Sequence, residues 1–329
     1  DVGFSLRQLR EVLQLLSQWR AAGGDEQLRF SYSASPTDML DRARQHLPAV
    51  PPEAVEKVVA FLTLDAQGIR RLAGKDEVEL DVPVWEHFKR VHRYLIRPLV
   101  RLNHERLAWG AATAERAQSI WMGSVANGYL PADLPWPNVN RVVGRIKAEI
   151  EAQLEVRAHE ICARHTGHVL HGIDFRRRFP GERFDDVGDF DVLAYWPQSN
   201  RWLAVECKYN QPSHCLKDAR RLRERIFGAG ADHGQFAKIE RRREFLARHV
   251  GRLRPLLGWP ESPAGREPVF REAYVCRDIS WWLKHPPYPV PTAFVRVDAL
   301  DGWLRGELGA LAGTERQFRD NEIGASDAP

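Results

Sequence analysis

The chain contains 329 residues, with a hydrophobic fraction of 43% and a formal net charge of +4. That fraction can build a sizeable core, which excludes wholesale disorder, and the length allows two domains or one large domain with an appendage. No run of about 18 apolar residues occurs, so we expect no membrane-spanning helix. The four cysteines form no CxxC pair and no zinc-binding spacing, and no signal peptide is visible, which indicates reduced thiols in a cytoplasmic protein. The chain begins at Asp1 without a methionine, which suggests a processed form or a piece of a longer protein.

Residues 1–140 are predicted to form a mostly helical domain that serves targeting or partner contact. Its segments show leucines at helical spacing, a Ser-Pro-Thr-Asp start, a leading proline pair and an amphipathic pattern that ends at Pro98. These four segments are residues 4–20, 35–47, 51–64 and 83–102. A proline-rich passage at residues 129–140 predicts a domain boundary.

Residues 141–315 show a different order of elements. A long helix is expected at residues 139–167, followed by three alternating segments that are typical of strands. Two basic helices, two further strands and a short helix come next. The three early strands are expected at residues 168–179, 188–196 and 201–209, the basic helices at 215–227 and 234–253, and the late strands at 268–279 and 292–300. This order predicts an α/β sandwich, and residues 316–329 are expected to be a flexible tail.

Two of the expected strands carry charged residues near their ends. In the second strand Asp189 and Asp191 share one face, and in the third strand Glu206 and Lys208 do so, because strand residues alternate between faces. A register symmetric about the intervening turn places Asp191 opposite Glu206 and Asp189 opposite Lys208. Directly opposed side chains lie about 4.5–5.5 Å apart at Cβ, so the two carboxylates repel unless a cation lies between them. A divalent cation and Lys208 both meet this need, and hard oxygen ligands favour Mg²⁺ or Mn²⁺.

These residues resemble a known catalytic core. Asp191, a hairpin and Glu206-Cys207-Lys208 look like the D-x(n)-E-x-K core of the PD-(D/E)XK, or restriction-endonuclease-like, nuclease superfamily. The GDFD stretch that ends at Asp191 is similar to the Gly-Glu-Ile-Asp variant of some branches, with Phe190 where the family name puts proline. The resemblance covers about half of the chain, roughly residues 149–311, and includes the order of elements. It implies a restriction-endonuclease-like mixed sheet flanked by helices.

The resemblance also implies a site and a reaction. Asp191, Glu206 and the main-chain carbonyl of Cys207 are expected to hold Mg²⁺ or Mn²⁺, and Lys208 to orient the attacking water and stabilise developing charge. Asp189 is expected to tune Lys208 or to bind a second ion. The family tends to carry an acid on the preceding helix, and Glu155 is our candidate because it lies beside the apolar face of that helix. The expected activity is metal-dependent hydrolysis of phosphodiester bonds, by an endonuclease of restriction, phage defence or repair.

The basic helices are the candidate nucleic-acid interface. Residues 212–254 contain twelve Lys or Arg against five acidic residues, so the positive charge of the chain is local. The residues expected to bind phosphate are Lys217, Arg220, Arg221, Lys238 and Arg242. Lys238, Arg242 and His249 are predicted to lie away from the apolar side of their helix. DNA is favoured over RNA as the partner, and a homodimer or larger complex is compatible with the sequence.

Other interpretations of the same residues stay open at this point. Asp191, Glu206 and Lys208 also suit a salt-bridge ladder on the exposed face of a hairpin, and charge runs are usually solvated faces. A catalytically inactive nuclease-fold module that binds nucleic acid or a protein partner is the alternative function. The histidines at 159, 165, 168 and 171 fit no zinc pattern and are interpreted as structural. Gln235 is expected either to touch the site or to be a polar helix N-terminus.

Overall fold

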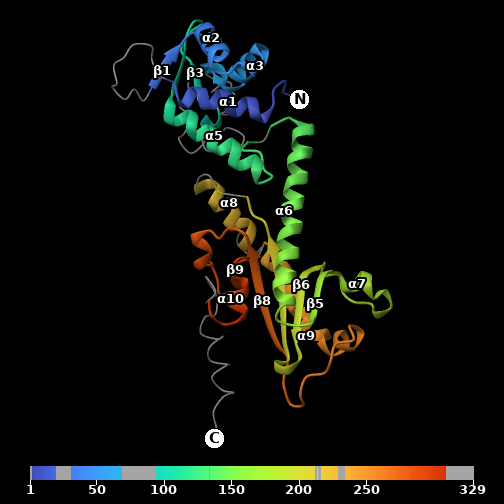
Figure 1. Cartoon of the computed structure of the whole chain (residues 1–329). Helices are drawn as coiled ribbons and strands as arrows, with labels where there is room; N and C mark the ends of the chain where they lie inside the picture. The colour runs from blue at the N-terminus through green and yellow to red at the C-terminus, as the bar shows by residue number, and fades with distance from the viewer. Residues whose placement is uncertain are drawn as a thin grey trace. The chain divides into compact units, whose positions relative to one another are not determined.

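The computed structural model describes residues 2–19, 31–68, 94–132, 134–211, 213, 216–228 and 234–308. It divides into two compact units, Asp1–Ala148 and Glu149–Pro329. The division falls within one long helix, α6 (Pro137–Ala163), and each unit has its own sheet (Figure 1). The expected tail at 316–329 and most of the amphipathic segment at 83–102 lie outside the described residues.

The first unit combines helices with a small sheet. Among the described residues, its helices are α1 (Leu6–Ser17), α2 (Pro36–His46), α3 (Pro52–Leu62) and α5 (Ala111–Ala126). Serine side chains begin two of them: Ser5 and Ser35 each accept a hydrogen bond from the backbone three residues on, in reciprocal capping boxes. Leu9, Leu13 and Leu16 of α1 are buried in the core of this unit, as their helical spacing predicts.

The sheet of the first unit was not anticipated from the sequence, which predicted a mostly helical domain. Its strands run in the order β1 (Ser31–Ala34), β4 (Leu107–Gly110), β3 (Leu99–Arg101) and β2 (Thr63–Leu64), with one parallel and two antiparallel pairings. A strand of two to four residues is too short to show an alternating pattern. Strands β1 and β2 also pair with strands that lie far away in the chain, so local sequence carries little signal for these pairings.

The second unit is built on a five-stranded mixed sheet. Its strands, in spatial order, are β5 (His168–Ile173), β6 (Phe190–Trp196), β7 (Arg201–Lys208), β8 (Val269–Cys276) and β9 (Ala293–Arg296). The pairings of β5, β6 and β7 are antiparallel, and those of β7, β8 and β9 are parallel. All five strands were predicted. The first of them ends early, because Asp174 caps a short helix, α7 (Phe175–Arg178), where the sequence predicted more strand.

Helices line the sheet of the second unit (Figure 1). They are α6, α8 (Leu216–Phe227), α9 (Phe236–Leu256) and the short α10 (Leu300–Leu304). Phe245 and Leu246 of α9 share a buried cluster with Leu193 of β6 and Trp202 of β7, so α9 covers one face of the sheet. The chain is therefore a mixed α/β protein with two mixed sheets.

The hairpin between β6 and β7 has the symmetric register that the sequence predicted. The pairs run from Val192 with Val205 to Trp196 with Arg201. A single 3₁₀ turn, Pro197–Ser199, makes the connection, and Asn200 closes it in the left-handed region with a φ of 47°. Asparagine tolerates that conformation better than most residues, because its short side chain bonds locally.

Candidate metal and catalytic site

The charged ends of β6 and β7 lie inside the second unit. Asp191 and Glu206 are each only 6% exposed, and β7 is the middle strand of the sheet. An exposed salt-bridge ladder, one of the interpretations left open by the sequence, is therefore contradicted. Burying two carboxylates is costly unless cations and hydrogen bonds compensate them, so the surroundings of this pair decide what the site can do.

Three oxygen atoms converge on the ammonium group of Lys208. Its Nζ lies 2.5 Å from Glu206 Oε1 and 3.6 Å from Asp191 Oδ2, and it donates a hydrogen bond of 3.1 Å to the carbonyl oxygen of Cys207. These are the three oxygens expected to hold a divalent cation. The strand geometry thus creates a cation position bordered by two carboxylates and a carbonyl.

Asp191 is held firmly in this arrangement. The backbone N–H of Cys207 donates a hydrogen bond of 2.7 Å to Asp191 Oδ2. The pKa of Asp191 is raised to about 6, chiefly by burial and also by the neighbouring charges of Glu206 and Glu155, while Lys208 and the Cys207 N–H act in the opposite direction. Burial alone lowers the pKa of Lys208, but the attraction of Glu206 and Asp191 outweighs it and the net shift is upward. Lys208 is therefore a permanent cation at neutral pH.

Arg242 belongs to this site rather than to an outer basic face. We predicted an outward position, but the residue is 7% exposed and its Nη1 forms an ion pair with Glu206 Oε2. The correction follows from helix geometry: Arg242 comes three residues after Ile239 and four before Leu246, so it lies on their buried face. Its Nε also donates to the carbonyl oxygen of Val187 at 3.2 Å.

Asp189 and Glu155 lie at the margins of the cluster. Asp189 was expected to tune Lys208 or to bind a second ion, and the structure places its Oδ1 4.0 Å from Arg242 Nη2 with the side chain 66% exposed. Glu155, on α6, contacts Nε2 of His171 at 3.5 Å. Its charge contributes to the raised pKa of Asp191, so it is close enough to act on the site electrostatically.

A polar network borders the site on the next strand. Tyr274 of β8 pairs with Glu206, and its hydroxyl donates to Gln235 Oε1 at 2.8 Å and accepts from Asn210 Nδ2 at 3.0 Å. Gln235 begins α9, and its side chain does not cap that helix. Gln235 therefore lies at the N-terminus of α9 and contacts Tyr274, a neighbour of Glu206. Sequence reasoning missed Asn210 and Tyr274, because no local pattern links the end of β7 to β8.

The remaining predicted basic residues lie on α8 and α9. Arg221 and Lys238 are exposed. Arg220 is exposed as well, and its Nε contacts Glu224 at 2.7 Å. Lys217 falls within α8, but its side chain is outside the described part of the structure. These residues remain candidates for phosphate contacts.

Hollows border the described residues of the second unit. A cleft of about 1020 Å³ reaches Asp189 and His171 and is bordered by Arg176, Arg177 and Arg178 of α7. Two of these charges are balanced locally: Arg176 pairs with Asp186 at 2.7 Å, and Arg177 pairs with Asp174 at 3.2 Å.

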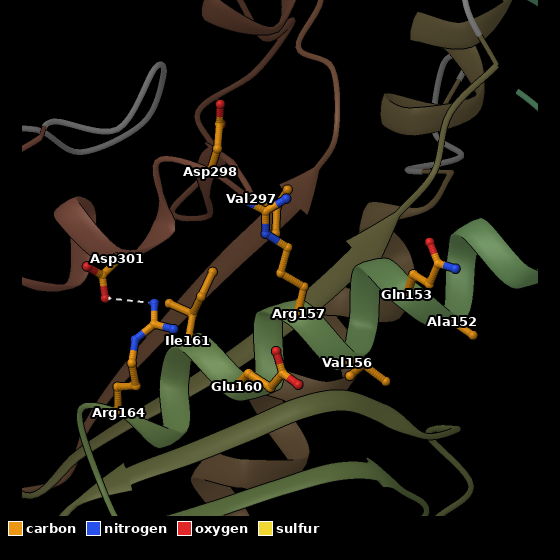
Figure 2. Close-up of a pocket in the computed structure, with 10 residues that line it drawn as sticks. All are labelled: Ala152, Gln153, Val156, Arg157, Glu160, Ile161, Arg164, Val297, Asp298 and Asp301. Atoms are coloured by element: carbon orange, nitrogen blue, oxygen red, sulfur yellow. Dashed lines mark hydrogen bonds and ion pairs between the residues drawn. The ribbon is translucent and has the colours of Figure 1, made fainter.

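A second groove, of about 640 Å³, lies between α6 and the segment that follows β9. Figure 2 shows Arg164 pairing there with Asp301, and the distance is 3.2 Å. None of the residues that line this groove belongs to the cluster around Lys208. Its walls carry charges of both signs, so it has no clear preference for a charged ligand.

The three oxygen atoms around the Lys208 ammonium group suit an incompletely coordinated Mg²⁺ or Mn²⁺ ion. Among the described residues, no group of three or more His, Cys, Asp or Glu side chains is arranged to hold a metal ion. Asp191 and Glu206 supply two carboxylates and Cys207 supplies a carbonyl. Mg²⁺ is usually bound through one or two carboxylates and keeps its other positions for water and substrate phosphate. The donor set fits this open coordination, and it does not form a complete protein cage.

The three comparisons with known proteins do not extend this description. No family model matches the chain, and the searches of curated proteins and of solved structures found no match either. Within the part of the chain that the structure describes, no helix has both the length and the apolar character that crossing a bilayer requires.

Proposed function

We propose that this chain is a divalent-metal-dependent nuclease that hydrolyses phosphodiester bonds in DNA, on a restriction-endonuclease-like fold. One observation carries the proposal. Three oxygens, from Asp191, Glu206 and the Cys207 carbonyl, meet at one cation position at the ends of two buried strands. A salt bridge that only stabilised the fold would not need a main-chain carbonyl in the same position.

The residues of the site would divide the work as follows. Asp191, Glu206 and the Cys207 carbonyl would bind Mg²⁺ or Mn²⁺, which acidifies a bound water and offsets charge on the phosphoryl group. Lys208 keeps its proton, so it would orient the attacking water and stabilise the negative charge that develops on the phosphate oxygens. Glu155 would add negative charge that favours cation binding. The products are a cut strand with one phosphate end and one hydroxyl end.

The substrate and setting follow from the charge distribution and from the number of sites. Phosphate contacts by exposed residues such as Arg220, Arg221 and Lys238 would position DNA without reading its sequence. One hairpin supplies one site and cuts one strand, so two copies of the chain would be needed for a double-strand break. The first unit would serve targeting or partner contact, and restriction, phage defence and repair in the cytoplasm are the roles that fit.

One observation favours a second candidate, an inactive nuclease-fold module that binds nucleic acid or a protein partner. Both carboxylate oxygens of Glu206 already face cations: Lys208 on Oε1 and Arg242 on Oε2. The charge of Glu206 is thus compensated by the protein itself. The two candidates differ in whether a divalent ion displaces Lys208 from these oxygens.

A cleavage assay separates the candidates. Supercoiled plasmid is incubated with the chain in Mn²⁺, in Mg²⁺ and in EDTA, beside Lys208→Ala and, as a matched control, Lys57→Ala on an exposed face of α3. We expect nicking or linearisation that requires metal, is lost in Lys208→Ala and is retained in Lys57→Ala. Equal cleavage by Lys208→Ala would refute the assignment. DNA retardation on a gel without cleavage would favour the binding module.

A further inference from the structure

Glu206 lies between two cation positions that are built alike. On one side, Lys208 Nζ faces Glu206 Oε1, Asp191 Oδ2 and the Cys207 carbonyl. On the other side, the guanidinium of Arg242 faces Glu206 Oε2, Asp189 Oδ1 and the Val187 carbonyl. Each cation position is therefore bordered by one oxygen of the bridging Glu206 carboxylate, by a second carboxylate and by one main-chain carbonyl.

This arrangement resembles the layout of a two-metal site. In such sites two ions lie about 3.5–4 Å apart and share a bridging ligand, and together they stabilise the attacking and leaving oxygens. Here the second position is filled by a side chain of the protein. An arginine is charged at every accessible pH, so it cannot make room for a metal ion by losing its proton.

The two cations differ in how easily they can leave. The side chain of Lys208 is 31% exposed, and Lys is a flexible point charge that can turn toward solvent. Arg242 is nearly sealed: its guanidinium lies 5.7 Å from the ring centroid of Phe190, and it passes close to Gly188. A Cβ built on Gly188 would come within 3.4 Å of Arg242 Nη2, and Gly188 has a φ of +75°, which favours glycine.

We propose that the Arg242 guanidinium takes the place of a second metal ion, so that the site binds a single divalent cation at the Lys208 position. This inference rests on the proposed function. Arg242 is then a positioning residue: it holds Glu206 between the two positions and supplies fixed positive charge on the side facing Asp189. Asp189 serves as a partner of Arg242 and not as a metal ligand.

The stoichiometry of Mn²⁺ binding tests the inference directly. The full chain is titrated with Mn²⁺ by isothermal titration calorimetry, and free Mn²⁺ is followed in parallel by electron paramagnetic resonance. We expect one ion per chain for the wild type and for Arg242→Lys, which keeps the charge. Arg242→Gln removes the charge and frees Glu206, Asp189 and the Val187 carbonyl, so a second, weaker ion is expected. Adding Asp189→Asn to Arg242→Gln should abolish that second ion.

The outcomes separate this inference from the proposed function. Two ions bound by the wild type would overturn the role of Arg242 and leave the nuclease proposal standing. Arg242→Gln that is folded by circular dichroism and still binds one ion would do the same. No binding by the wild type would instead overturn the metal site itself. If Arg242→Gln fails to fold, the stoichiometries of the wild type and of Arg242→Lys still decide.

Discussion

The ion pair between Glu206 and Arg242 should make a large contribution to the stability of the second unit. Arg242→Met keeps the length of the side chain and removes its charge, which leaves Glu206 buried with Lys208 as its remaining cation. Breaking a buried pair by removing one partner costs about 3–5 kcal/mol. Because Lys208 still compensates Glu206, we expect the lower end, about 3 kcal/mol. For a unit of this size that lowers the Tm by about 6–12 °C.

The measurement is a double-mutant cycle in EDTA, with guanidinium unfolding followed by tryptophan fluorescence. Arg242→Met, Glu206→Gln and the double variant are compared, and we expect the double variant to lose about 1–3 kcal/mol less than the sum of the single losses. Arg248→Met is the matched control, because Arg248 lies on the same helix and pairs with Asp185 at 3.0 Å in an exposed position. Exposed pairs contribute about 0–1 kcal/mol. A loss for Arg242→Met no larger than that for Arg248→Met would contradict a stabilising buried pair, and so would additive losses for Arg242→Met and Glu206→Gln.

Three further predictions concern metal, pH and DNA. Mn²⁺ at 100 times its Kd should raise the Tm of the wild type by about 5–10 °C, and Asp191→Asn should abolish most of that rise. An equal rise in Asp191→Asn would contradict the role of Asp191 as a metal ligand. Burial raises the pKa of Glu272 above its usual value, more than the hydrogen bond from Thr292 and the charge of Arg243 lower it. The stability that comes from the protonated Glu272 carboxyl is therefore complete below the pKa of the unfolded state and is lost as pH rises through the pKa of the folded state. The Tm of the wild type should fall relative to that of Glu272→Gln between pH 4 and pH 8. A difference in Tm that stays constant over this range would contradict the prediction. Replacing Arg220 and Arg221 by Ala should weaken DNA binding and reduce the slope of log K against log salt by about 2, whereas the same change at the exposed Arg44 of α2 should leave the slope unaltered.

The first unit illustrates how short strands escape sequence analysis. Helices α1, α2 and α3 were predicted from leucine spacing, a Ser-Pro-Thr-Asp start and a leading proline pair, because these signals lie within one or two turns of the chain. Helix α5 was not predicted. The sheet of the unit pairs Ser31–Ala34 with Leu107–Gly110, some seventy residues away. Such a pairing is decided by contacts that form only when the unit is folded. Helix α7 is a different case, because there a local signal, the Asp174 cap, prevailed over a strand-like alternation.

The sequence by itself determined the hairpin and the placement of Asp191, Glu206 and Lys208 on it. Strand alternation and turn chemistry are local, so the register could be worked out from the turn outward, and the pairs from Val192–Val205 to Trp196–Arg201 agree with it. Only the tertiary structure decided what surrounds these residues. It buried both carboxylates, brought Glu155 near them, and joined Glu206 to an arginine 36 residues further along the chain. A helical pattern shows which residues share a face, but the partner of a buried charge depends on which strand packs against that face.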